Sequence, residues 1–226
     1  KTLETLVINF VSYVYLCYFY RCNMNQELQI LIKSKELFFK LGVRSITMDD
    51  ISSELGISKK TLYQYVNNKS DLVNKTLLLH FADEKLVISD VIGNAENAMD
   101  EIIRIARASL KQFRSMHPST IYDIKKYYPE AWKLIDQFKS DFIYCCIKEN
   151  IVKGKAEGMY RMKIDEDVIA RLYINSIDYL VNPYNFPAVQ YNFSDLYKEF
   201  ISYHLQGISA ERGYLYLKNI QLEENE

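Results

Sequence analysis

The segment from Lys59 to Lys69, KKTLYQYVNNK, combines cationic and hydrogen-bonding side chains and contains no acidic residue. In a helix, successive residues are about 100° apart, so Leu62 and Val66 would lie close together and face the interior. The outer side would carry Lys60, Thr61, Tyr63 and Gln64, with Tyr65 at its edge. Lysines neutralise phosphates, hydroxyl groups bond phosphate oxygens, and Gln or Lys reaches base edges. The chemistry of this recognition segment, residues 59–69, therefore suits a nucleic-acid duplex.

Two residues at neighbouring helix ends extend this surface. Lys69 adds a positive charge where the next helix begins, and the free N–H groups of a helix N-terminus also favour a phosphate. Thr47 opens the preceding helix, so its hydroxyl and the helix dipole could act on a nearby phosphate. The alternative is that Thr47 only caps its helix and that Tyr63 only packs.

Three short helices must position these side chains. The first is expected at residues 26–41, the second begins after Thr47 and ends at Gly56, and the third spans residues 59–66 after a Ser58 cap. Two helices joined by a Gly-Ile-Ser turn are the sequence form of a helix-turn-helix.

The remaining chain is predicted to form long amphipathic helices. We expect them at residues 70–91, 95–114, 118–127, 129–154, 165–181 and 193–209, with a last one near 210–222. No stretch alternates with a period of two, so the predicted fold class is all-α. The expected domains are an apolar N-terminal extension (1–23), a helix-turn-helix DNA-binding domain (24–72) and a larger helical domain (73–226).

The stretch ELFFKLGVRSITMDDISSELGISKKTLYQYVNNKSDLV resembles the DNA-binding domain of TetR-family (TetR/AcrR-like) transcriptional repressors. The matching positions are Leu37, Phe38, Gly42, Thr47, Ile51, Gly56, Ser58, Thr61, Leu62, Tyr63, Tyr65, Lys69 and Leu72. Two positions depart from the family pattern, which usually has Phe at Val66 and often a small residue at Lys60. The long Lys60 cation belongs to the recognition segment, so an operator sequence cannot be transferred from relatives.

The resemblance implies a homodimeric repressor that binds a pseudo-palindromic double-stranded DNA operator and is released by a small-molecule effector. The resemblance and the helix geometry together give these candidates for DNA contact: Thr47, Ser58, Lys59, Lys60, Thr61, Tyr63, Gln64, Tyr65 and Lys69. In this family the C-terminal helical domain binds the effector and dimerises through its last two long helices. The segments GKAEGMYR (154–161) and QGISAERG (206–213) also resemble family members, though weakly.

Apolar faces in the C-terminal domain supply candidates for these two roles. For the dimer interface the candidates are Leu172, Ser176, Leu180, Tyr197, Phe200, Ile201, His204 and Leu205, although both helices could instead be interior. For the effector pocket the candidates are Phe113, Met116, Tyr127, Tyr128, Trp132 and Tyr173, with Tyr122, Phe138 and Tyr144 as further aromatic residues that could line it. Aromatic residues at helical spacing are more often core than pocket wall.

Composition and motifs constrain the other classes of function. The net charge of -1 excludes a uniformly basic protein, so a nucleic-acid surface must be local. The four cysteines show no disulfide pattern, and we predict no metal and no cofactor. His80 and Glu84 could ligate a metal, but a surface contact between them is the simpler interpretation. Without a phosphate loop or a nucleophile elbow, we expect no enzyme.

Residues 1–23 stand apart from the rest in composition. VINFVSYVYLCYFY (7–20) approaches the length of a short membrane span, but Asn9, Ser12 and its tyrosines weaken that interpretation. Upstream translated sequence or a disordered extension is preferred to a membrane anchor, and we expect a cytoplasmic protein with no membrane partner. The alternative function is a helical ligand- or partner-binding protein that no longer reads DNA.

Overall fold

The computed structural model describes residues 25–182, 184–187 and 189–223, so the predicted extension at 1–23 lies outside the described residues. The helices are α2 (Gln26–Leu41), α3 (Met48–Glu54), α4 (Lys59–Leu62), α5 (Lys69–Asn94), α6 (Ala98–Ser115), α7 (Thr120–Tyr127), α8 (Pro129–Phe138), the π-helical turn η1 (Lys139–Ile143), α9 (Tyr144–Ala156), α10 (Glu166–Leu180), α11 (Phe193–Ile208) and α12 (Glu211–Glu223). Strand-like pairing among the described residues is confined to a single bridge between Tyr160 and Ser209. The all-α prediction is confirmed.

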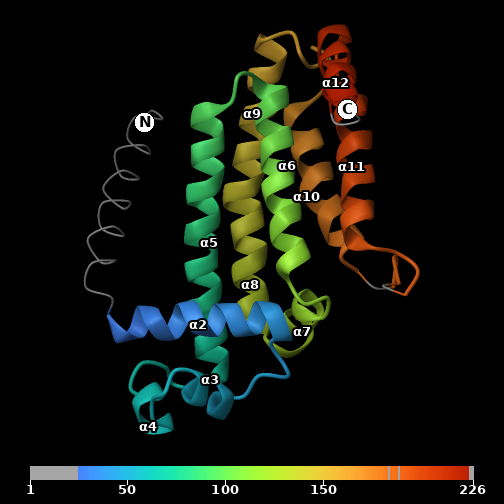
Figure 1. Ribbon diagram of the computed structural model, residues 1–226. Helices are drawn as coiled ribbons and strands as arrows, with labels where there is room; N and C mark the ends of the chain where they lie inside the picture. The colour runs from blue at the N-terminus through green and yellow to red at the C-terminus, as the bar shows by residue number, and fades with distance from the viewer. Residues whose placement is uncertain (1–24, 183, 188, 224–226) are drawn as a thin grey trace.

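Long helices form an upright bundle, and the small N-terminal helices lie at one end of it (Figure 1). α2 crosses the base of the bundle and packs on α5, while α3 and α4 lie below it. α5 packs on α6 and α8, α9 packs on α6 and α10, and α11 packs on α6 and α10. α12 lies at the opposite end from α4. None of the described helices combines the length and apolar character that crossing a bilayer requires.

Two apolar cores fill this arrangement. One joins the helix-turn-helix to the first turns of α5 through residues such as Phe38, Ile51, Leu62 and Leu72. The other lies among α6, α9, α10 and α11 and includes Tyr160. Because α5 runs unbroken from Lys69 to Asn94, the expected domain boundary after residue 72 falls inside one continuous helix.

Helix caps fix the helix-turn-helix locally. Thr47 and Asp50 form a capping box, in which the Thr47 hydroxyl accepts from the Asp50 N–H and the Asp50 carboxylate accepts from the Thr47 N–H. Ser58 caps α4 by accepting from the Thr61 N–H at 3.0 Å. Gly42 ends α2 with a φ of 88°, a left-handed conformation that other residues rarely adopt.

Several predicted helix boundaries were wrong; for example, α5 continues to Asn94 rather than stopping at residue 91. α4 ends at Leu62 rather than at residue 66, because the chain must turn at residues 63–65 to enter α5. The helix expected to stop at Gly154 continues to Ala156 and contains η1. Gly154 therefore lies inside the helix, where the absence of a Cβ atom leaves room for the ring of Tyr160.

Candidate nucleic-acid interface and internal cavity

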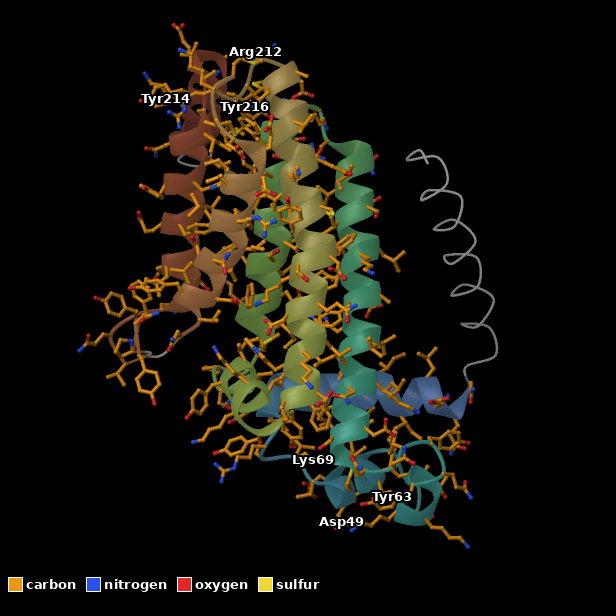
Figure 2. The ribbon with its side chains drawn as sticks, turned by 180° about the vertical axis from the view of Figure 1, so that it is seen from behind. Asp49, Tyr63, Lys69, Arg212, Tyr214 and Tyr216 are labelled. Atoms are coloured by element: carbon orange, nitrogen blue, oxygen red, sulfur yellow. The ribbon has the colours of Figure 1, made fainter. Side chains whose placement is uncertain are left out.

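The recognition segment presents its polar side chains at the lower end of the molecule. Leu62 and Val66 are buried, as their spacing predicted, and they anchor the segment to the first core. Lys60, Tyr63 and Gln64 are exposed, and the Tyr63 ring is 44% accessible. Figure 2 shows Tyr63, Lys69 and Asp49 together at this end, far from Arg212 and Tyr214 at the other. Since α4 stops at Leu62, Tyr63 and Gln64 project from the turn that follows it.

Several other DNA-contact candidates already have partners within the protein. The Lys59 ammonium lies 2.9 Å from the Asp49 carboxylate, and this hydrogen bond raises the pKa of Lys59. The Thr47 hydroxyl lies 2.7 Å from the Asp50 carboxylate. These pairs are at the surface, so a phosphate could compete for each of them.

Tyr65 and Lys69 are held more firmly. The Tyr65 hydroxyl donates to the side-chain oxygen of Gln26 at 3.0 Å, which ties the turn to the start of α2. The half-buried Lys69 ammonium donates to the backbone oxygen of Arg44 at 3.2 Å, and burial lowers its pKa. Both residues therefore also help to shape the surface that presents Lys60 and Tyr63.

An apolar cavity of about 170 Å³ lies inside the helical bundle above α2. Four of the six pocket candidates line it, namely Phe113, Met116, Trp132 and Tyr173, and Phe138 does too. Its lower wall includes Phe39 of α2 and Thr120, Ile121 and Ile124 of α7. The cavity thus borders directly on elements that contact the helix-turn-helix.

The other aromatic candidates lie outside this cavity. The Arg44 guanidinium stacks over the Tyr127 ring at 4.8 Å and donates to its hydroxyl, and Tyr128 packs against the core of the helix-turn-helix. Tyr122 is exposed at the surface of α7, and the Tyr144 hydroxyl bonds Asp167. Sequence spacing could not distinguish these residues from those that line the cavity, because it does not show which side of α7 or α8 faces the cavity.

His80 and Glu84 line the cavity and do not form the surface pair that the sequence suggested. His80 Nε2 and Glu84 Oε2 are 3.7 Å apart, which exceeds hydrogen-bond distance. Burial lowers the pKa of His80 to about 4 and raises that of Glu84 to about 7. Within the described residues, no three His, Cys, Asp or Glu side chains gather in a way that could hold a metal ion.

Sequence reasoning did not assign Glu84, Lys139, Asp178 or Tyr197 to this cavity. Lys139 in η1 donates to both Asp178 oxygens at 2.6 Å, and Tyr197 lies 3.4 Å from Tyr173 between their hydroxyl oxygens. One signal was available for Glu84, which falls three residues after Phe81 and four before Ile88, on the buried stripe of α5. The π-helical turn that positions Lys139 has no comparable pattern of apolar residues in the sequence.

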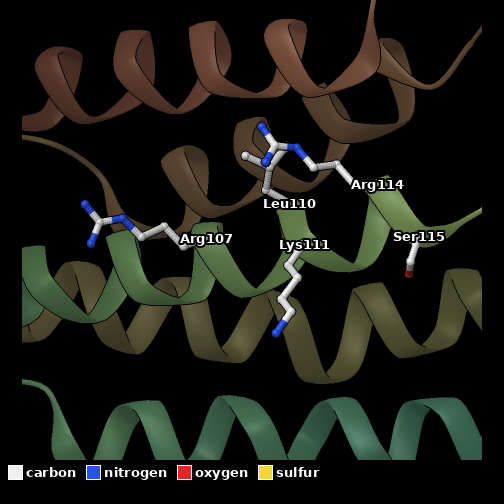
Figure 3. Close-up of a pocket in the computed structure, with 5 residues that line it drawn as sticks. All are labelled: Arg107, Leu110, Lys111, Arg114 and Ser115. Atoms are coloured by element: carbon white, nitrogen blue, oxygen red, sulfur yellow. The ribbon is translucent and has the colours of Figure 1, made fainter. Parts of the chain in front are cut away.

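A second hollow, of about 440 Å³, lies on the outside of α6 between Arg107, Leu110, Lys111, Arg114 and Ser115 (Figure 3). The long cationic side chains point away from one another over neighbouring helices. The hollow is wide open to solvent and lacks the aromatic walls of the internal cavity.

The dimer-interface candidates are divided between the surface and the interior of the protomer. Leu172 is 58% exposed, whereas Ser176, Leu180, Phe200 and Ile201 are half-buried. Three candidates are buried instead: Tyr197 lines the cavity, Leu205 belongs to the second core, and His204 packs on the rings of Tyr173 and Phe200. The exposed large apolar side chains of α10 and α11 are Val168, Leu172, Tyr179 and Tyr203.

The segments 154–161 and 206–213, which weakly resemble TetR-family members, pair with each other at the end of the bundle opposite α4. The Arg161 N–H donates to the Ile208 oxygen, and the Ala210 N–H donates to the Met159 oxygen, each at 2.9 Å. The Tyr160 hydroxyl is buried 2.9 Å from the Asn150 side-chain oxygen. This pairing joins the end of α9 to the junction between α11 and α12.

The fold defines a helix-turn-helix protein with a larger helical companion domain. Residues 30–76 match the family model for bacterial regulatory proteins, tetR family. This segment therefore matches the DNA-binding domain of TetR-family transcriptional regulators, and a relative that is similar over most of the chain is described as an HTH-type transcriptional regulator.

Known proteins resemble this chain well beyond the matched segment. The uncharacterized HTH-type transcriptional regulator YvaF of Bacillus subtilis (strain 168) is 26% identical over 184 residues, which cover 81% of this chain and 95% of the relative. A putative transcriptional regulator from Saccharomonospora viridis, solved in complex with choline, has a TM-score of 0.67 at 18% identity, covering 82% of this chain and 98% of its own. A transcriptional regulator from Cytophaga hutchinsonii has a TM-score of 0.65 at 16% identity, covering 80% and 97%.

Proposed function

We propose that the chain is a homodimeric repressor that binds a pseudo-palindromic operator and leaves it when a small molecule enters the internal cavity. The observation that carries the DNA-binding part is the surface formed by Lys60, Tyr63 and Gln64. Within the described residues Lys60 has no ion-pair partner, so its full charge is available to a phosphate. Thr47, Ser58, Lys59, Thr61, Tyr65 and Lys69 complete the proposed contact set. A cytoplasmic location follows from this role.

Release of DNA is supported by the contacts between the cavity and the helix-turn-helix. Phe39 of α2 lines the cavity, and its backbone oxygen accepts from the His117 N–H at 2.5 Å in the loop between α6 and α7. A ligand that displaces Phe39 or α7 would therefore tilt α2 and move the recognition segment. A coupling of about 1–3 kcal/mol is typical of allosteric regulators and changes affinity by tens of fold. The choline held by the Saccharomonospora regulator supports the idea that such a bundle admits small organic molecules.

The first test is selection of genomic fragments that bind the purified chain, followed by titration of a selected fragment at several salt concentrations. Lys60→Ala should weaken binding and reduce the slope of log affinity against log salt by about 1, because one phosphate is no longer neutralised. Lys218→Ala is the matched control, because Lys218 is exposed on α12 at the opposite end of the molecule. Unchanged affinity and slope in Lys60→Ala would favour the alternative, a helical ligand- or partner-binding protein that does not read DNA.

A further inference from the structure

The positive and negative charges of the groups around the internal cavity do not cancel. Those that line it are His80, Glu84, Lys139, Cys146, Tyr173, Asp178 and Tyr197, contributed by α5, η1, α9, α10 and α11. Lys139 is matched by Asp178, since its ammonium donates to both oxygens of that carboxylate. Lys139 also lies 3.0 Å from Asp136 on the outer side, so no positive charge remains for the cavity.

The remaining groups apart from Glu84 are neutral around pH 7. Burial lowers the pKa of His80 to about 4, and the Gln112 amide nitrogen lies 3.1 Å from its ring nitrogens. Burial also raises the pKa of the Cys146 thiol to about 12 and raises the pKa values of Tyr173 and Tyr197. Glu84 therefore decides the charge of the cavity.

The Glu84 side chain is 21% exposed at the cavity and has no matching cation among the described residues. Among the described residues its only ion-pair-range contact is with His80 at 3.7 Å, and it accepts no hydrogen bond. Its charge also raises the pKa of Tyr197, which locates it near the phenol on the facing helix α11. A buried carboxylate without a partner is costly, and a ligand that supplies a positive charge would remove that cost.

We propose that the cavity takes a small apolar cation, such as an arylalkyl amine, with its ammonium group against the Glu84 carboxylate. This inference rests on the proposed role of the cavity as the effector site and names the chemical class of the effector. Aromatic rings of Phe81, Phe113, Trp132 and Tyr173 surround the remaining volume. Such rings attract cations through their faces and accept apolar groups equally well.

The size of the cavity further limits the class of cation that it can hold. A dry cavity of about 150 Å³ admits a benzene molecule, so a volume of about 170 Å³ fits one aromatic ring with a short chain. Larger multi-ring cations would require the walls to move.

Binding of a cation must be linked to the protonation of Glu84. The pKa of this buried carboxyl is about 7 in the free protein, so the group is mostly protonated at pH 6 and mostly ionised at pH 8. Because the cation requires the ionised form, its affinity should rise about tenfold between pH 6 and pH 8. A neutral ligand that accepts a hydrogen bond from the protonated Glu84 carboxyl would show the opposite trend.

The test uses the full chain and calorimetric titration with three probes of nearly equal size: phenethylammonium, 2-phenylethanol and phenylacetate. We expect phenethylammonium to bind at least about tenfold more tightly than either of the others at pH 8, because only it can pair with the carboxylate. Equal or tighter binding of the alcohol or the anion, or binding of none of the three, overturns the proposal. This comparison needs no variant and so does not depend on whether one folds.

Two variants locate the binding energy. Glu84→Gln should reduce the affinity for phenethylammonium about tenfold or more and abolish its pH dependence, while 2-phenylethanol binding changes little. Asp90→Asn removes an exposed charge from the same helix and should change neither. Unchanged cation affinity in Glu84→Gln overturns the proposal. Operator binding is measured in a separate experiment. If the cation binds but DNA is not released, the cavity is not the effector site of the proposed repressor. If the chain binds DNA but not the cation, only the proposed chemical class of the ligand is wrong.

Discussion

At the scale of single residues, the proposed DNA-binding surface includes the acidic side chain of Asp49, whose charge opposes phosphate binding. Asp49 lies at the same end of the molecule as Tyr63 and Lys69, and its carboxylate holds the ammonium of Lys59 at 2.9 Å. Both side chains are exposed, so the pair contributes little to stability. Its main effect is to neutralise a lysine that could otherwise meet a phosphate.

Asp49→Asn should therefore tighten DNA binding about three- to tenfold at low salt, because it removes a like charge near the phosphates and frees Lys59. The measurement is fluorescence anisotropy with a selected operator fragment, with the melting temperature measured in parallel. Glu36→Gln, which removes an exposed charge on α2, is the control for net charge. Weaker binding by Asp49→Asn would mean that Asp49 orients Lys59 for contact.

At the scale of elements, Gly154 shows how a single missing side chain sets the packing of α9. A Cβ atom at this position would overlap the ring of Tyr160, whose hydroxyl is buried against Asn150 and the Ala98 oxygen. The ring cannot move without breaking these hydrogen bonds. Gly154→Ala should thus lower the free energy of unfolding by about 1–3 kcal/mol in urea denaturation.

Gly93→Ala is the matched substitution on α5, where nothing lies within 4 Å of the added Cβ. It should leave stability unchanged or raise it by about 0.5–1 kcal/mol, because alanine loses less conformational freedom in a helix. Equal effects of the two substitutions would show that Tyr160 does not constrain Gly154.

The sequence revealed the elements better than it revealed the cavity. Helical periodicity and caps such as Thr47 and Ser58 are local, so the helix order and the inward side of the recognition segment could be predicted. The end of α4 depends on how the chain must turn into α5, and the directions in which Tyr127 and Tyr197 point depend on how their helices pack against the rest of the bundle. The packing of one helix against another cannot be read from the periodicity of a single sequence.

At the scale of the whole molecule, α10 and α11 expose several large apolar side chains. Val168, Leu172 and Tyr179 are half or more exposed along one side of α10, and Tyr203 of α11 is 80% exposed. Exposed apolar side chains that share one side of a helix favour a protein interface at that side. We therefore place the proposed homodimer contact on this face, with Tyr197, His204 and Leu205 supporting it from inside the protomer.

Leu172→Glu should convert the proposed dimer to a monomer, because the added carboxylate of each copy would be buried in the interface without a partner. Sedimentation should then give the chain mass of 26.7 kDa rather than twice that value. Leu78→Glu is the matched control, because Leu78 is similarly exposed but lies on α5, across the bundle from α11. Losing the second recognition segment should also weaken operator binding by about a hundredfold or more. A wild-type chain that sediments as a monomer, or a Leu172→Glu variant that stays dimeric, would contradict an interface at this face.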